Sequence, residues 1–254
     1  MKKRLLLQGL LILCCLLLLP AQAETRGECG PAADWTLSDD GVLTITGRGA
    51  VDSNAFTYRG DIREVVIGEG VTGIGDYTFH ACSSLTRVTL PESLTAIGWQ
   101  AFGDCGKLAE IRLPEKLTWL GKEAFWQCGS LEAIEIPAGV EVIRENTFYR
   151  CTRLTGVVIP EGITGIGVGA FSQCGRLQEV LLPRSLARLD MNAFYSCASL
   201  TAVTFLNPDT VIDYWVFPEC PAELVLYCDG GRAQAYAEAN GIRQAPLSRS
   251  PQLE

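Results

Sequence analysis

The sequence predicts a β-rich α/β solenoid, in which successive coils of the chain stack into a rod with a parallel sheet on one face. Three observations favour it. Phenylalanine recurs every 23 residues from Phe56 to Phe217 without an insertion. Cysteine, leucine and valine or isoleucine recur in phase with it. A short run in each unit alternates with period two, as a strand with one buried face does. A unit of this size cannot bury its apolar side alone and does so against its neighbours.

Residues 1–23 are the first element and are predicted to be a secretory signal peptide. Lys2, Lys3 and Arg4 precede an apolar run from Leu5 to Leu19, and Ala21-Gln22-Ala23 is a typical small-residue cleavage site. The run is shorter than the roughly 20 residues of a membrane span. We therefore expect export, cleavage, no anchor motif and no membrane insertion afterwards. Cleavage lowers the net charge from -8 to -11, since the segment carries three positive charges. Nucleic acid is a poor partner for so acidic a chain.

Residues 24–54 are expected to cap the first coil with a β-hairpin. The segment from Asp34 to Thr46 alternates around Asp40-Gly41, a dipeptide typical of tight hairpin turns. The first coil of a solenoid has no preceding neighbour, so its outer face needs such a cover.

The solenoid itself is predicted over residues 55–222. One unit reads A-F-x-x-C-x-x-L-x-x-V-x-L-P-x-x-L-x-x-I-G. The V-x-L run is the predicted strand, and the proline ends it because proline cannot donate to a ladder. Strands of successive units then form a parallel sheet with a spacing of about 4.8 Å. The rest of each unit returns the chain through a short turn or helical piece that holds the Ala-Phe pair.

Cysteine forms a ladder with the same period. Its members are Cys82, Cys105, Cys128, Cys151, Cys174, Cys197 and Cys220. With Cys29 and Cys228, nine cysteines follow the signal peptide, so they cannot all pair within one chain. Several cysteines in an exported chain usually indicate disulfides, but each of these lies in a turn between a buried phenylalanine and a buried leucine. We therefore expect inward thiols with a packing role. Zinc is the alternative, but it needs four converging ligands, whereas these thiols form a straight row.

Residues 223–243 are predicted to cap the other end with a strand and a short helix. Leu224, Leu226 and Cys228 alternate as a strand does, and Ala233 to Asn240 is helical in composition with Gly241 as its stop. Residues 244–254 are polar and contain proline and serine, so we expect a disordered tail.

These features together resemble the leucine-rich repeat of the BspA type, also called the Treponema pallidum type, which occurs in many secreted and surface proteins of bacteria. The resemblance covers residues 55–222 and extends to the flanks, "CGPAADWTLSDDGVLTITGRG" before the repeats and "AQAYAEANGI" after them. It implies a right-handed leucine-rich-repeat solenoid that is secreted or surface-associated. It also implies adhesion, or contact with an extracellular or cell-surface protein of a host or neighbouring bacterium. We expect a monomer.

Catalysis has little material in this sequence. His80 is the only histidine, which disfavours triads and histidine-based metal sites, and no glycine-rich phosphate loop precedes a helix. A solenoid glycoside hydrolase or lyase is the enzymatic alternative, with Glu110 and Glu135 on adjacent strands as a carboxylate pair. Arg112 lies between them as a ready salt-bridge partner. We therefore expect no catalytic residue, no cofactor and no metal; a cleft shared by the two glutamates would favour the enzyme.

The outward face of the predicted sheet is the first candidate binding surface. It carries Arg87, Thr89, Glu110, Arg112, Glu135, Val158, Glu179 and Leu181. Solenoids bind partners along such extended faces, and the exposed aliphatic pair Val158 and Leu181 among charges suits contact with a protein. Strand propensity alone also explains these two residues. This face predicts a binding module for protein–protein recognition.

An aromatic group on the returning side is the second candidate. Trp119, Trp126 and Tyr149 come from two neighbouring coils. Aromatic rings suit protein hot spots or stacking against sugars, and half-buried packing explains them as well. Carbohydrate binding is therefore the alternative function, and it requires the group to be exposed and coplanar.

Overall fold

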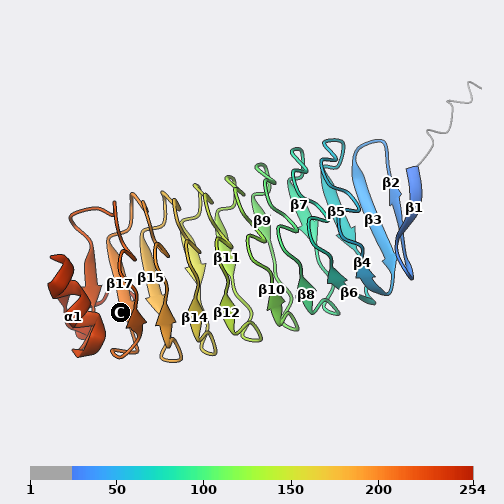
Figure 1. The fold of residues 1–254 in the computed structure, drawn as a ribbon. Coiled ribbons are helices and arrows are strands. Elements are labelled where there is room, and N and C mark those ends of the chain that lie inside the picture. Colours follow the sequence, from blue (N-terminus) through green and yellow to red (C-terminus); the bar gives the residue numbers. More distant parts are fainter. Residues whose placement is uncertain (1–24, 254) are drawn as a thin grey trace, which may run out of the picture.

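The computed structural model describes residues 25–253 and shows a rod of stacked coils (Figure 1). The predicted signal peptide, residues 1–23, lies outside this range. The coils carry two sheets, one on each side of the core, and a short helix closes the C-terminal end. The predicted solenoid fold is confirmed.

The N-terminal cap is a small antiparallel sheet. It contains β1 (Thr25–Gly30), β2 (Ala33–Leu37) and β3 (Val42–Gly47). Strands β2 and β3 form the predicted hairpin, and Gly41 in its turn has φ 86°, a conformation that glycine adopts without steric cost. Strand β1 adds an outer strand that the sequence did not predict. Strand β3 pairs in parallel with the first repeat strand, so the cap leads directly into the solenoid.

The first sheet is formed by the V-x-L segments. Its repeat strands are β5 (Glu64–Ile67), β7 (Arg87–Thr89), β9 (Glu110–Ile111), β11 (Ala133–Glu135), β13 (Gly156–Val158), β15 (Glu179–Leu182), β17 (Ala202–Phe205) and β19 (Val225–Tyr227). All pairs between these strands are parallel. Pairing is interrupted twice within residues 25–253, between β9 and β11 and between β13 and β15.

A second sheet lies on the returning side of the coils, where the sequence predicted only a turn or helical piece. Its strands are β4 (Gly49–Val51), β6 (Val71–Ile74), β8 (Ala96–Ile97), β10 (Trp119–Leu120), β12 (Val142–Ile143), β14 (Gly165–Ile166), β16 (Arg188–Leu189) and β18 (Val211–Ile212). Most contain only two residues. The glycine after several of them is required by close stacking, because a Cβ at Gly121 would lie 2.5 Å from the carbonyl carbon of Gly98.

The core is a continuous stack of phenylalanine rings from Phe56 to Phe217. Neighbouring rings are nearly parallel, with centroids 5.3–5.6 Å apart. All eight are buried, and each contributes about 1.5–3 kcal/mol relative to an exposed side chain. The fixed period therefore fixes the register of every coil on the next.

The cysteine ladder runs beside this stack, and its thiols point into the core. Each Sγ donates to the carbonyl oxygen of the phenylalanine 26 residues earlier, at 3.1–3.3 Å. All nine cysteines of the described residues are free thiols. Burial raises the pKa of Cys82 to about 12 and that of Cys220 to about 11. The ladder thus holds neutral thiols inside the core.

The C-terminal cap consists of α1 (Gly231–Asn240), which ends at Gly241 in the left-handed conformation with φ 66°. The following residues differ from the prediction of a disordered tail. Residues Arg243–Ala245 form β20, which pairs in parallel with β19, and Leu247–Arg249 form the short 3-10 helix η1. Unpaired backbone groups at the edge of β19 explain this order, because a further strand satisfies them.

Candidate binding face of the first sheet

The outward residues of the first sheet lie on one face, as strand alternation requires. In β7 the buried Val88 separates Arg87 from Thr89, and both of these are exposed. Seven of the eight predicted face residues are exposed: Arg87, Thr89, Glu110, Arg112, Glu135, Val158 and Glu179. Leu181 is half-buried, so it does not form a fully exposed apolar pair with Val158.

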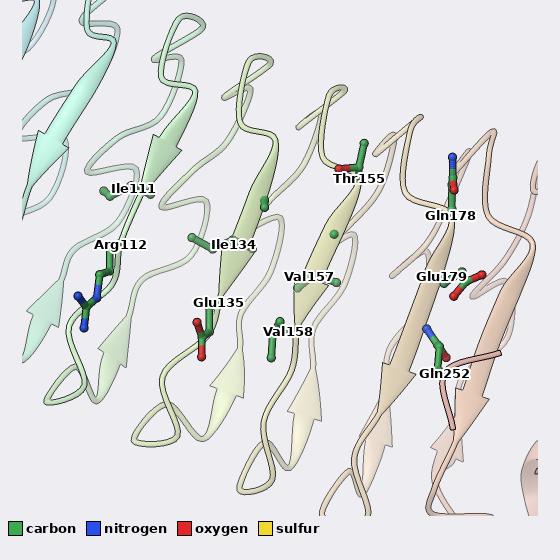
Figure 2. Close-up of a pocket in the computed structure, with 12 residues that line it drawn as sticks. Ile111, Arg112, Ile134, Glu135, Thr155, Val157, Val158, Gln178, Glu179 and Gln252 are labelled. Carbon is green, nitrogen blue, oxygen red and sulfur yellow. The ribbon is translucent and has the colours of Figure 1, made fainter. Parts of the chain in front are cut away.

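A hollow in this face has a volume of about 610 Å³. Its walls include Arg112, Glu135, Val158, Glu179 and Gln252. Figure 2 shows Glu135 on one side of Val158, with Glu179 and Gln252 on the other. The hollow exists because two adjacent strands begin with small residues. Ala133 and Gly156 stand where the neighbouring strands carry Glu110 and Glu179.

The floor of the hollow is apolar and lies next to the gap between β13 and β15. Val157 is half-buried there, whereas Val88, Ile111, Ile134 and Val180 at the same position of other coils are buried. The outward Val158 is 57% exposed. The apolar floor thus lies on β13, whose pairing with β15 is interrupted.

The charges around the hollow are arranged differently from the prediction. Arg112 was expected to lie between Glu110 and Glu135 as their salt-bridge partner. Its guanidinium nitrogen instead lies 4.0 Å from a carboxylate oxygen of Glu92. Glu92 belongs to the preceding coil and follows strand β7. Within residues 25–253, neither Glu135 nor Glu179 forms an ion pair.

The C-terminal segment covers part of the face and was missed by sequence reasoning. Ser250 is buried, and its Oγ lies 2.6 Å from Oγ1 of Thr204. The Gln252 carboxamide, oriented so that its nitrogen faces acceptors, donates to Thr204 Oγ1 at 2.7 Å and to the carbonyl oxygen of Val180 at 3.1 Å. This cover explains why Leu181 is half-buried. No local sequence signal identifies this cover, because its contacts with Thr204 and Val180 join residues 46 or more positions apart.

Glu110 and Glu135 line different depressions. Glu110 faces one with Arg87 and Arg112, whereas Glu135 faces the larger hollow. The shared cleft that a carboxylate-pair enzyme requires is therefore not formed by these two depressions.

The predicted aromatic group is divided between two environments. The ring of Trp119 is 50% exposed, and the guanidinium carbon of Arg144 lies 3.8 Å from its centroid. Trp126 and Tyr149 stack on one another with centroids 6.3 Å apart and an interplanar angle of 10°, and both are half-buried.

A further aromatic group, missed by sequence reasoning, lies nearer the N-terminal end. His80 is in edge contact with Tyr58 and Tyr77, and Tyr77 contacts Trp99 with centroids 4.9 Å apart. Tyr58 and Tyr77 both have positive φ, 61° and 56°. These positions recur in every coil but hold mostly polar residues elsewhere, such as Gln100.

Residues 25–253 contain no group of three or more His, Cys, Asp or Glu side chains able to hold a metal ion. In the same part of the chain, no helix has the length and apolar character needed to cross a membrane.

The two stacked parallel sheets, the repeated strand-and-turn unit and the open sheet face define a leucine-rich-repeat solenoid. The model of the BspA type leucine-rich repeat region matches residues 49–149 and 118–230, and the chain belongs to this family.

Solved structures of bacterial leucine-rich repeat proteins are similar. A protein from Eubacterium ventriosum is 22% identical with a TM-score of 0.57, over 80% of this chain and 72% of that chain. A leucine rich cell surface protein from Faecalibacterium prausnitzii is 25% identical with a TM-score of 0.51, over 82% of this chain and 77% of that chain. No curated protein sequence matches this chain.

Proposed function

We propose that this protein is an exported, non-catalytic binding module that recognises a protein at a host or bacterial surface through the first-sheet face. The hollow around Val158 carries this proposal. It combines exposed apolar surface with ionic groups on a sheet face, which is the composition of a protein contact site. The family and the likeness to a protein described as cell surface support a location outside the cell.

Carbohydrate binding through the predicted aromatic group has less support. Trp126 and Tyr149 each turn one ring face toward the other and are half-buried, and Arg144 covers one face of Trp119. The area left for stacking against a sugar ring is therefore smaller than an exposed, coplanar group offers.

Capture of purified extracellular-matrix and host-surface proteins by residues 24–254 tests the proposal. The key variant is Val158→Asp, which places a charge in the apolar centre of the face. Val211→Asp is the matched control, because Val211 is an exposed strand valine on the second sheet. Circular dichroism confirms that both variants fold.

We expect a captured protein to be lost with Val158→Asp and retained with Val211→Asp. Equal capture by both variants contradicts a site on the first sheet. Loss with Trp119→Ala alone would instead favour the aromatic surface.

A further inference from the structure

We propose that the hollow between Glu135 and Glu179 receives a lysine or arginine side chain of the protein partner. This inference rests on the proposed function and deepens it by naming the chemistry of the partner's anchor residue. Three properties of the hollow support it, namely its empty volume, its apolar floor and its unpaired carboxylates.

The empty volume is not imposed by the fold. A Cβ built on Gly156 meets no atom within 4 Å, and this glycine does not have a positive φ. Packing and backbone conformation would therefore accept a larger residue at position 156. The glycine leaves a hollow of about 610 Å³, which is ample for one long side chain.

The floor suits the aliphatic stem of such a side chain. Val157 and Val158 supply its exposed apolar surface. Lysine and arginine bury their methylene stems along apolar surface while the charged end remains near polar groups. An acidic side chain lacks a stem of that length.

The charges at the rim select a cation. Glu135 and Glu179 stand on opposite sides of the floor (Figure 2), and neither forms an ion pair within residues 25–253. Arg112, the cation of the hollow wall, extends to Glu92. The whole chain is acidic, with a net charge of -8, and it attracts a basic partner at long range.

Binding of a fluorescein-labelled octalysine peptide, followed by fluorescence anisotropy, tests the charge. The double variant Glu135→Gln with Glu179→Gln removes both carboxylates of the hollow. The control is Glu141→Gln with Glu223→Gln, two exposed residues outside the hollow, which changes the net charge equally. We expect about tenfold weaker binding for the hollow variant, roughly 1.4 kcal/mol, and less than about threefold for the control. Equal losses would overturn the proposal, because they indicate general attraction by an acidic surface.

Filling the hollow tests the shape without changing any charge. Gly156→Phe places a ring in the open space, and Gly106→Phe is its control, since a Cβ at Gly106 also meets nothing within 4 Å. We expect Gly156→Phe to reduce octalysine binding by about fivefold or more and Gly106→Phe to leave it unchanged. Unchanged binding by Gly156→Phe contradicts insertion into the hollow. Acetylated octalysine, which keeps the stem and loses the charge, is expected not to bind.

The two proposals fail in different ways. A captured protein that is lost with Val158→Asp but retained with Glu135→Gln and Glu179→Gln refutes the cationic anchor and leaves recognition by the sheet face intact. A protein retained by all of these variants refutes both.

Discussion

Each ladder cysteine places a thiol against one backbone carbonyl inside the core. The S–H group is a weak donor on a small, largely apolar side chain, so it adds a second hydrogen bond to a turn carbonyl that already accepts a backbone N–H. Cys151 makes this contact with the carbonyl oxygen of Phe125 at 3.3 Å and is fully buried. The same unit is repeated at every coil, so one residue type serves seven equivalent sites.

Substitution of a ladder cysteine by aspartate tests this assignment. Cys151→Asp buries a carboxyl group among apolar side chains, and we expect it to lower the free energy of unfolding by about 3 kcal/mol or more. Glu135→Ala removes an exposed side chain and is expected to change it by less than about 0.5 kcal/mol. Urea denaturation measures both. Similar midpoints would show that Cys151 does not point inward.

The inward position of the cysteines and phenylalanines could be predicted from the sequence, because a strict period places the same contacts in every coil. The outward residues have no such constraint. Arg112 could be assigned to the sheet face, but its pairing with Glu92 depends on side-chain conformation. The hollow at Ala133 and Gly156 forms because two adjacent strands lack a large side chain at the same position. That coincidence is seen only when the strands are placed side by side.

At the scale of elements, the C-terminal segment is the main difference from the predicted architecture. Its polar composition predicts disorder when the segment is considered alone. In the structure, β20 extends the first sheet. Ser250 contacts β17, and Gln252 contacts β15 and β17, on the outward face of this sheet. The second sheet was also missed, because a strand of two residues is too short to show a period.

Removal of residues 246–254 tests the role of this segment. We expect the truncated protein to remain folded and to lose about 1–2 kcal/mol of stability, because Thr204 loses its buried partner. Hydrogen exchange is expected to accelerate in β15 and β17, with β5 and β7 as internal controls. Unchanged exchange in β15 and β17 would mean that the segment does not cover them in solution.

At the scale of the molecule, the buried thiols link stability to alkaline pH. Burial raises the pKa of Cys29 to about 11 and that of Cys82 to about 12, from an ordinary value of 9.0. Above pH 9 the unfolded chain therefore binds fewer thiol protons than the folded chain. The contribution of these neutral thiols to the free energy of unfolding is fully present below pH 9. It is lost as pH rises toward the raised pKa values.

Thermal unfolding between pH 8 and pH 11 measures this linkage. We expect Tm to fall steadily above about pH 9. Tyrosine and lysine titrate in the same window, so the control is a variant with Cys105, Cys128 and Cys151 changed to alanine, whose Tm should fall less steeply. The same slope in both proteins would contradict a contribution from the ladder.

The first sheet presents an outward face along the rod, which the C-terminal segment covers in part. The central claim is that a protein partner binds on this face at the hollow. Hydrogen exchange of the chain, alone and with a captured partner, tests this claim most directly. We predict slower exchange at residues 133–135, 156–158 and 178–181 in the complex. Protection confined to residues 96–99, 119–126 and 149, on the returning side, would contradict the claim and assign recognition to the aromatic surface.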